Sequence, residues 1–191
     1  MQGTDKSRVI QAAFEAILRG NYPQAAAIVQ DQYSFTPLSV ERKGFPPYYA
    51  TKIFFRYGFI DRYSGKRLVF PPVLKIMSNA LPMDFPYHPH WKMDQCHVAY
   101  WELYPTVDHV VPLARGGNGD ETNLVCTSML SNGAKANWTL EELGWQLLPA
   151  GDIQRWDGLV GWFLEYTEEH QEALEDQLVK RWYTAATRIA T

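Results

Sequence analysis

The residues best suited to chemistry lie in one short stretch of the chain. Asp108 and His109 stand side by side, a pair of glycines follows, and Asn123 and Asn132 come fourteen residues after His109 and nine residues after Asn123. Carboxylate and amide oxygens are ligands for hard divalent cations, and an imidazole can accept a proton near neutral pH. The pattern therefore predicts a small metal site with a proton acceptor beside it.

The segments that carry these residues favour a strand, a glycine loop, a second strand and a helix. Residues 106–111 are rich in β-branched side chains, residues 114–122 are polar and glycine-rich, residues 123–125 return as a strand, and residues 128–138 follow as a helix. In this order, side chains at the end of the first strand can meet a polar side chain of the helix.

This arrangement resembles the HNH nucleases, whose ββα-metal core has Asp-His on its first strand, Asn fourteen residues after the His and a third polar ligand on the helix. The similarity spans residues 58–138 and is strongest in 107–135. The Asn-x-x-Lys ending also occurs in the HNH domain of the RNA-guided CRISPR nuclease. The resemblance implies a metal-dependent endonuclease that hydrolyses phosphodiester bonds in DNA, in restriction, phage defence or mobile-element processing.

The resemblance also implies roles for individual residues. Asp108 and Asn132 would bind one divalent cation, Mg²⁺ or Mn²⁺, and His109 would be the general base that takes a proton from the attacking water. The Asn123 side chain would bond across the loop and hold the backbone carbonyl that fixes the His109 ring. Lys135 would contact a phosphate.

Many HNH proteins carry two Cys-x-x-Cys pairs that bind a structural zinc. The aligned positions in this chain offer one carboxylate and three hydroxyls, and its two cysteines belong to no such motif. Hydroxyls are poor zinc ligands, so we expect no structural zinc and a core held by packing. The four aligned positions are Asp61, Ser64, Ser128 and Ser131.

Charge is distributed unevenly along the chain, whose net charge is −3. Residues 1–75 carry 11 Lys or Arg against 5 Asp or Glu, whereas residues 141–191 carry 4 against 10. Because DNA phosphates are bound by basic side chains, we expect the N-terminal part to face DNA. The candidate phosphate contacts are Lys52 and Arg56, four apart on one face of a predicted helix, and Arg115 in the glycine loop.

Further helices are expected on both sides of the strands. Helical spacing of apolar residues predicts a helix over residues 7–19, and another follows Pro23. Near the C-terminus an apolar stripe predicts one long helix, from Gly161 to Thr184. We expect its aromatic side chains to bury a partner or a second copy of the chain. The stripe consists of Phe163, Tyr166, His170, Leu174, Leu178 and Trp182.

Length and composition favour a single α+β domain. The chain has 191 residues, of which 46% are hydrophobic, and this is enough to build one core. We expect an N-terminal helical region (1–57), a ββα-metal core (58–145) and a C-terminal helical region (146–191) packed as one compact unit. Without a bilayer-length apolar run or a signal-like start, a cytoplasmic protein with no membrane partner is expected.

Two other classes of function remain open. The chain can be a nucleic-acid-binding or interaction module with an inactive HNH core, although the complete set Asp108, His109 and Asn132 argues against this. It can also be a subunit that docks onto a larger machine through its acidic C-terminal helix. Whether the isolated chain binds or cuts DNA separates these alternatives.

Overall fold

The computed structural model describes residues 5–35 and 44–190. The chain divides into two compact units, Met1–Glu41 and Arg42–Thr191. The first expected boundary, after residue 57, lies inside the second of these units. Among the described residues, no helix combines the length and apolar character needed to cross a bilayer.

The first unit is a helical hairpin, as the spacing of its apolar residues predicts. Its helix α1 (Lys6–Leu18) is capped by Asp5 and α2 (Tyr22–Gln32) by Asn21, and both capping side chains accept a backbone N–H of the first turn. Small side chains let the two helices pack closely. The buried members of this contact are Ala13, Ala16 and Ala25.

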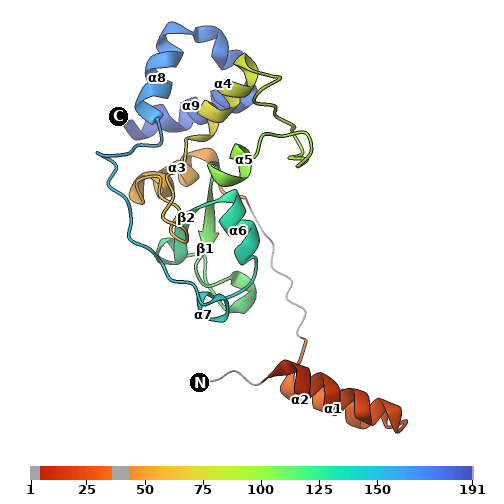
Figure 1. The fold of residues 1–191 in the computed structure, drawn as a ribbon. Helices are drawn as coiled ribbons and strands as arrows, with labels where there is room; N and C mark the ends of the chain where they lie inside the picture. Colours follow the sequence, from red (N-terminus) through yellow and green to blue (C-terminus); the bar gives the residue numbers. More distant parts are fainter. Residues whose placement is uncertain (1–4, 36–43, 191) are drawn as a thin grey trace. The chain divides into compact units, whose positions relative to one another are not determined.

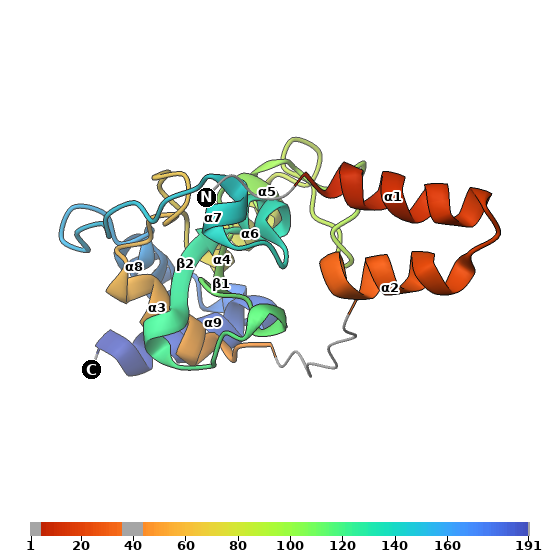
Figure 2. The same cartoon turned by 90° about the horizontal axis from the view of Figure 1, so that it is seen from below.

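The second unit is α+β, with one two-stranded antiparallel sheet among helices (Figures 1 and 2). Strand β1 (Pro105–His109) pairs with β2 (Leu124–Ser128), and α6 (Met129–Lys135) follows β2 directly. The strand, loop, strand and helix therefore occur in the predicted order. The other α-helices are α3 (Pro47–Arg56), α4 (Pro71–Ala80), α5 (Ala99–Glu102), α7 (Leu140–Leu143), α8 (Val160–Glu169) and α9 (Gln177–Ala190).

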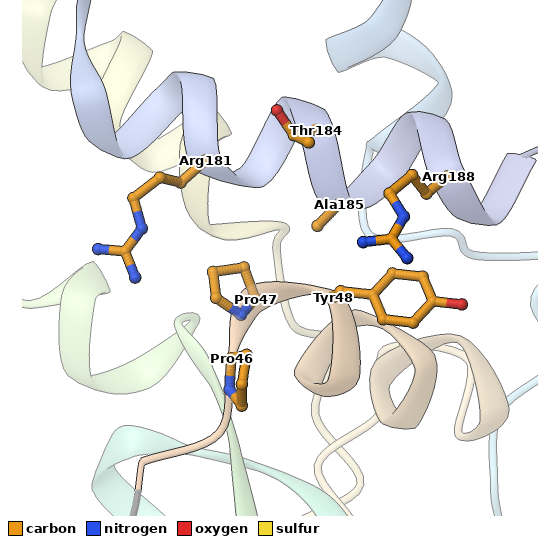
Figure 3. Close-up of a pocket in the computed structure, with 7 residues that line it drawn as sticks. All are labelled: Pro46, Pro47, Tyr48, Arg181, Thr184, Ala185 and Arg188. Atoms are coloured by element: carbon orange, nitrogen blue, oxygen red, sulfur yellow. The ribbon is translucent and has the colours of Figure 1, made fainter.

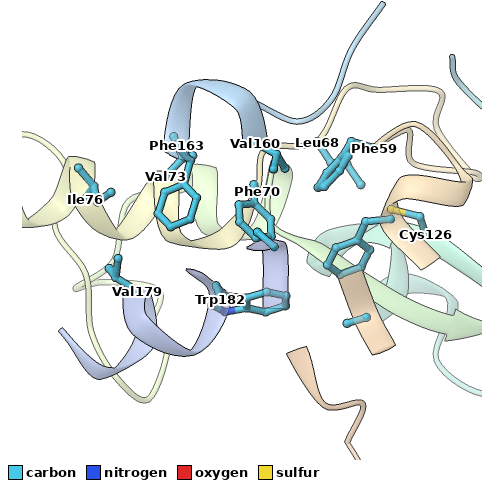
Figure 4. Close-up of a cluster of buried hydrophobic side chains, with 13 residues drawn as sticks. Phe59, Leu68, Phe70, Val73, Ile76, Cys126, Val160, Phe163, Val179 and Trp182 are labelled. Carbon is cyan, nitrogen blue, oxygen red and sulfur yellow. The ribbon is translucent and has the colours of Figure 1, made fainter. Parts of the chain in front are cut away.

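An aromatic core joins the helices of this unit to the sheet. Phe70, next to the start of α4, lies edge-on to Phe163 of α8 and Trp182 of α9, with ring centroids 5.4 and 5.5 Å away (Figure 4). Side chains of α3 belong to the same cluster, and Cys126 of β2 and Val107 of β1 pack with them. One face of the sheet is therefore covered by this core.

The C-terminal segment is not the single helix predicted over Gly161–Thr184. A short 3₁₀ helix, Gln171–Glu175, separates α8 from α9. Asp176 then caps α9, because its carboxylate accepts the N–H groups of Leu178 and Val179 at 2.9 and 3.2 Å.

The apolar stripe of this segment packs against the core of the same chain. Phe163 is fully buried and Trp182 is 8% exposed, both within the aromatic core. Tyr166 packs against the same cluster. The reason for expecting a partner or a second copy on this stripe is therefore removed.

Candidate functional site

The two strands place their side chains on two faces that have different neighbours. Asp108 pairs with Val125 and His109 with Leu124 in the antiparallel register. Because side chains alternate along a strand, Thr106 and Asp108 share one face and Val107 and His109 share the other. Val107 faces the aromatic core, so Asp108 points away from it, toward α6.

The carboxylate of Asp108 is buried and holds two hydrogen-bond donors on one oxygen. Its Oδ2 accepts the Tyr63 hydroxyl at 2.7 Å and the Lys135 ammonium at 2.9 Å. Burial and the Asp108 charge raise the pKa of Tyr63, which keeps this hydroxyl protonated. The second oxygen, Oδ1, is left as the atom for a further ligand.

Lys135 is not exposed for the phosphate contact that the sequence led us to expect. Its side chain is fully buried, and its Nζ also donates to the His109 carbonyl at 2.8 Å. The ammonium lies 5.8 Å from the centroid of the Tyr63 ring. The reason is positional: Lys135 ends α6, a short helix that packs directly on both strands.

Asn132 reaches the same face of β1 as Lys135. Its amide nitrogen donates to the Thr106 hydroxyl at 2.9 Å. Residues three apart on a helix share a face, and Thr106 and Asp108 share a face of the strand. The structure therefore brings Asp108, Asn132 and Lys135 to one interface between β1 and α6.

The oxygens at this interface suit a hard divalent cation. Asp108 offers Oδ1, and the bond made by the Asn132 amide nitrogen leaves its Oδ1 available as a ligand, the oxygen chemistry that Mg²⁺ prefers. Within residues 5–35 and 44–190, no three His, Cys, Asp or Glu side chains gather as metal ligands. An ion here would be held by these two residues and by water.

His109 lies on the other side of β1 from Asp108. Its half-buried ring is 5.8 Å from the ring of Phe45, just ahead of α3. Burial lowers the pKa of His109; the Asp108 charge opposes this shift and the Lys135 charge adds to it. The imidazole is therefore neutral at physiological pH and able to accept a proton.

The loop between the strands is held by the Asn123 side chain. Its Oδ1 accepts Val111 N–H at 2.8 Å, and its Nδ2 donates to the carbonyls of Val111 and Asn118 at 3.0 and 2.8 Å. The predicted bonding across the loop is thus present. In the described part of the chain, however, no hydrogen bond reaches the His109 ring; it is Lys135 that holds the His109 carbonyl.

A glycine is required inside this loop. A Cβ at Gly117 would lie 1.9 Å from the Val111 carbonyl oxygen and 3.0 Å from Nδ2 of Asn123. A Cβ at Gly119, two residues later, would meet nothing within 4 Å. The Asn123 bonds therefore depend on the absence of a side chain at Gly117.

Three of the four positions aligned with zinc ligands meet around one buried carboxylate. Asp61 accepts the hydroxyls of Ser128 and Ser131 at 2.8 and 2.7 Å, and that of Thr127 at 2.8 Å. These bonds hold the pKa of Asp61 below its ordinary value although burial opposes them. Ser64 differs, because its backbone N–H and not its hydroxyl donates to the Asp61 carboxylate, at 3.4 Å.

Two of the three cations expected to bind nucleic acid have acidic partners. Arg56 pairs with Glu121 and also donates to its backbone carbonyl. Arg115 pairs with Glu142 at 3.0 Å. Lys52 is exposed on α3. Phosphate binding by these three residues stays a prediction, and the structure gives Arg56 and Arg115 another role, in linking segments of the chain.

Sequence reasoning missed several residues around the site. Tyr63 binds Asp108 from a turn 45 residues away, and Thr106 binds Asn132 across 26 residues. Phe45 beside His109 was missed as well. The only signal was the turn at Tyr63-Ser64-Gly65, and nothing in it indicated which side chain the tyrosine would meet.

Comparisons of the chain with models of protein families, with curated proteins and with solved structures returned no match.

Proposed function

We propose that the chain is a metal-dependent endonuclease that hydrolyses phosphodiester bonds in DNA, with a centre of the HNH type. One observation carries this proposal. Asp108 and Asn132, separated by 24 residues in the sequence, lie at one interface between β1 and α6, and His109 follows Asp108 at the end of the same strand. Their spacing alone suggested the same grouping.

Asp108 and Asn132 are the residues that would hold the divalent ion, Mg²⁺ or Mn²⁺, through one oxygen each. When bound, such an ion supplies positive charge that stabilises the phosphate and the leaving oxygen. Tyr63 and Lys135 orient the Asp108 carboxylate by binding its other oxygen. Because that oxygen already has two donors, the free one has a fixed direction.

His109 is the general base in this proposal. A half-buried, neutral imidazole at the end of a strand can take a proton from a water molecule that attacks a phosphate there. The peptide group that follows it is held at both of its polar atoms: Lys135 binds the His109 carbonyl, and Val110 N–H donates to the Asn123 carbonyl at 2.8 Å. These bonds limit the movement of the base relative to Asp108.

The experiment is cleavage of supercoiled plasmid, single-stranded DNA and RNA by the purified chain in Mg²⁺, Mn²⁺ or EDTA. We expect cleavage of DNA with either metal, 5′-phosphate ends and no cleavage in EDTA. The Asp108→Asn and Asn132→Ala variants should need more metal for the same rate. Equal cleavage in EDTA, or none under any condition, would contradict the proposal.

The ion pair between Lys135 and Asp108 favours a second candidate, an inactive nucleic-acid-binding module. In that case the buried ammonium takes the place of the metal and the interface is only structural. Isothermal titration separates the two candidates. An active centre takes up Mn²⁺ in the wild type and loses it in Asp108→Asn, whereas a structural ion pair takes up none in either.

A further inference from the structure

A groove of about 260 Å³ lies between the start of α3 and one side of α9. Figure 3 shows Arg181 and Arg188 projecting from α9 toward the segment that begins α3, with Arg188 beside the ring of Tyr48. The groove is thus apolar at its floor and basic along one wall. Its lining is formed by Pro46, Pro47, Tyr48, Arg181, Thr184, Ala185 and Arg188.

Both arginines are exposed and neither has an acidic partner among the described residues. This separates them from Arg56 and Arg115, whose charges are paired. Arg188 is held over the Tyr48 ring, with its guanidinium carbon 4.2 Å from the centroid. A guanidinium stacked in this way keeps its N–H donors directed outward.

On the α9 side of the groove, the chain carries basic side chains and no acidic ones. Residues 177–191 contain no Asp or Glu. The nearest acidic residue in sequence, Asp176, is paired with Lys75 of α4 at 3.0 Å and caps α9. An anionic ligand therefore meets two unpaired guanidinium groups on this side of α9.

The spacing of the arginines suits a chain of phosphates. Seven residues of α-helix place Arg181 and Arg188 about 10.5 Å apart along one face. This corresponds to about three nucleotides along one strand of B-form DNA, whose phosphates are about 3.4 Å apart along the axis.

The groove begins beside the proposed catalytic base. Phe45, whose ring is 5.8 Å from that of His109, directly precedes Pro46 in the groove lining. Phe45 and the start of the groove therefore lie on the face of the sheet that carries His109. A strand whose phosphates follow α9 approaches the end of β1 from this side.

We propose that Arg181 and Arg188 bind the sugar-phosphate backbone of substrate DNA and lead it toward His109. This inference rests on the proposed nuclease function and adds the surface that binds the substrate. Phosphate contacts of this kind fix the position of a duplex without reading its sequence. Tyr48 orients Arg188 and is a positioning residue.

The test is the salt dependence of DNA binding. Fluorescence anisotropy with a labelled duplex in Ca²⁺, at several NaCl concentrations, gives the slope of log affinity against log salt. Each phosphate contact contributes about 0.9 to this slope, so Arg181→Gln/Arg188→Gln should reduce it by about 2. The matched control Lys66→Gln/Arg155→Gln removes the same charge from exposed residues outside the groove and should leave the slope unchanged.

The outcomes distinguish this inference from the proposed function. A slope that falls equally in both double variants, or in neither, overturns the groove and leaves the nuclease proposal standing if the wild type cleaves. A slope that falls only in the groove variant, with no cleavage by the wild type, supports the groove and contradicts the nuclease. A wild type that does not bind DNA overturns the groove. Arg188→Lys, which keeps the charge, should keep the slope.

Discussion

At the scale of single residues, the buried ion pair of Lys135 and Asp108 is the main determinant of the site. Two opposite charges out of water stabilise each other only while both are present. Lys135 satisfies the carboxylate and the His109 carbonyl together, and Tyr63 donates to the same carboxylate oxygen. The orientation of Asp108 thus depends on two residues that lie outside the strand that carries it.

Lys135→Met should lower the free energy of unfolding by about 3 kcal/mol, because it leaves a buried carboxylate without its cation. Urea denaturation measures this loss. Lys66→Met, at an exposed position, should change it by less than about 0.5 kcal/mol. The double variant Lys135→Met/Asp108→Asn should lose less unfolding free energy than the sum of the losses in the two single variants. Additive losses would show that the two charges do not interact.

At the scale of elements, the turn near Tyr63, strand β2 and helix α6 are joined by the hydroxyl bonds around Asp61. These bonds lie at the positions that the sequence resemblance to HNH proteins aligns with zinc ligands. A single carboxylate with several hydroxyl donors can connect the same segments without a metal. The position of α6 on the sheet therefore depends on Asp61.

Ser131→Ala should destabilise the chain by about 2 kcal/mol, since it removes a hydrogen bond to a buried carboxylate. Ser64→Ala is the matched control, because the Ser64 hydroxyl does not bond to Asp61. Chemical denaturation of the two variants gives the comparison. Equal effects at both serines would mean that the bonds to Asp61 contribute nothing.

The stability that Asp61 supplies should depend on pH. Its pKa in the folded state lies below the unfolded value of about 3.9, so this contribution is fully present above that pH. It is lost as the pH falls through the folded pKa. The difference in unfolding free energy between the wild type and Asp61→Asn should therefore be constant near neutrality and shrink below about pH 4. A difference that grows in acid would reverse the assignment.

Chelation should separate activity from folding. We expect EDTA to abolish cleavage while shifting the melting temperature by only a few degrees, because Asp61 and its hydroxyl partners need no zinc ion to connect the elements. Calorimetry with and without EDTA measures this. One tightly held zinc per chain, or unfolding on chelation at room temperature, would contradict it.

The loop between the strands gives a test within one element. Gly117→Ala should lower stability by about 2 kcal/mol and slow cleavage, since its Cβ cannot fit beside the Val111 carbonyl and the Asn123 amide. Gly119→Ala lies in the same loop with open space around it and should have no such effect. Thermal melts of the two variants provide the comparison, and similar losses would show that the contact is not the cause.

The sequence predicted the elements whose signals are local. Asp-His on a strand, a glycine loop and polar residues on a helix were enough to predict the order of β1, β2 and α6. The break between α8 and α9 could not be predicted in this way, because the apolar stripe keeps its helical spacing through it. The break is made by Asp176 as a helix cap, and no Gly or Pro marks it.

The contacts between distant segments were equally hidden. The lysine that ends α6 carries the same sequence signal whether it is solvated or buried, and only packing of α6 on β1 decides this. The same holds for the pairing of Arg56 with Glu121, 65 residues apart. Periodicity shows which face of an element is apolar but not which element covers it.

At the scale of the whole chain, charge is distributed unevenly even within the acidic C-terminal region. Residues 141–191 carry a net negative charge, yet every acidic residue in that range precedes α9. Helix α9 itself carries three basic residues and no acidic one. The basic part of the C-terminal region is therefore α9, with Arg181 and Arg188 on one face. A net charge of −3 does not prevent DNA binding when the positive charge is gathered in this way.

In the proposed nuclease, His109 takes a proton from the attacking water only as the transition state forms, so its loss should slow cleavage without weakening DNA binding. Single-turnover cleavage of plasmid DNA by His109→Ala, beside its DNA binding in Ca²⁺, tests this most directly. The proposal predicts a loss of cleavage rate of about 100-fold or more with binding changed by less than about threefold. Cleavage within about threefold of the wild type would contradict it, since the proton must then go to another group.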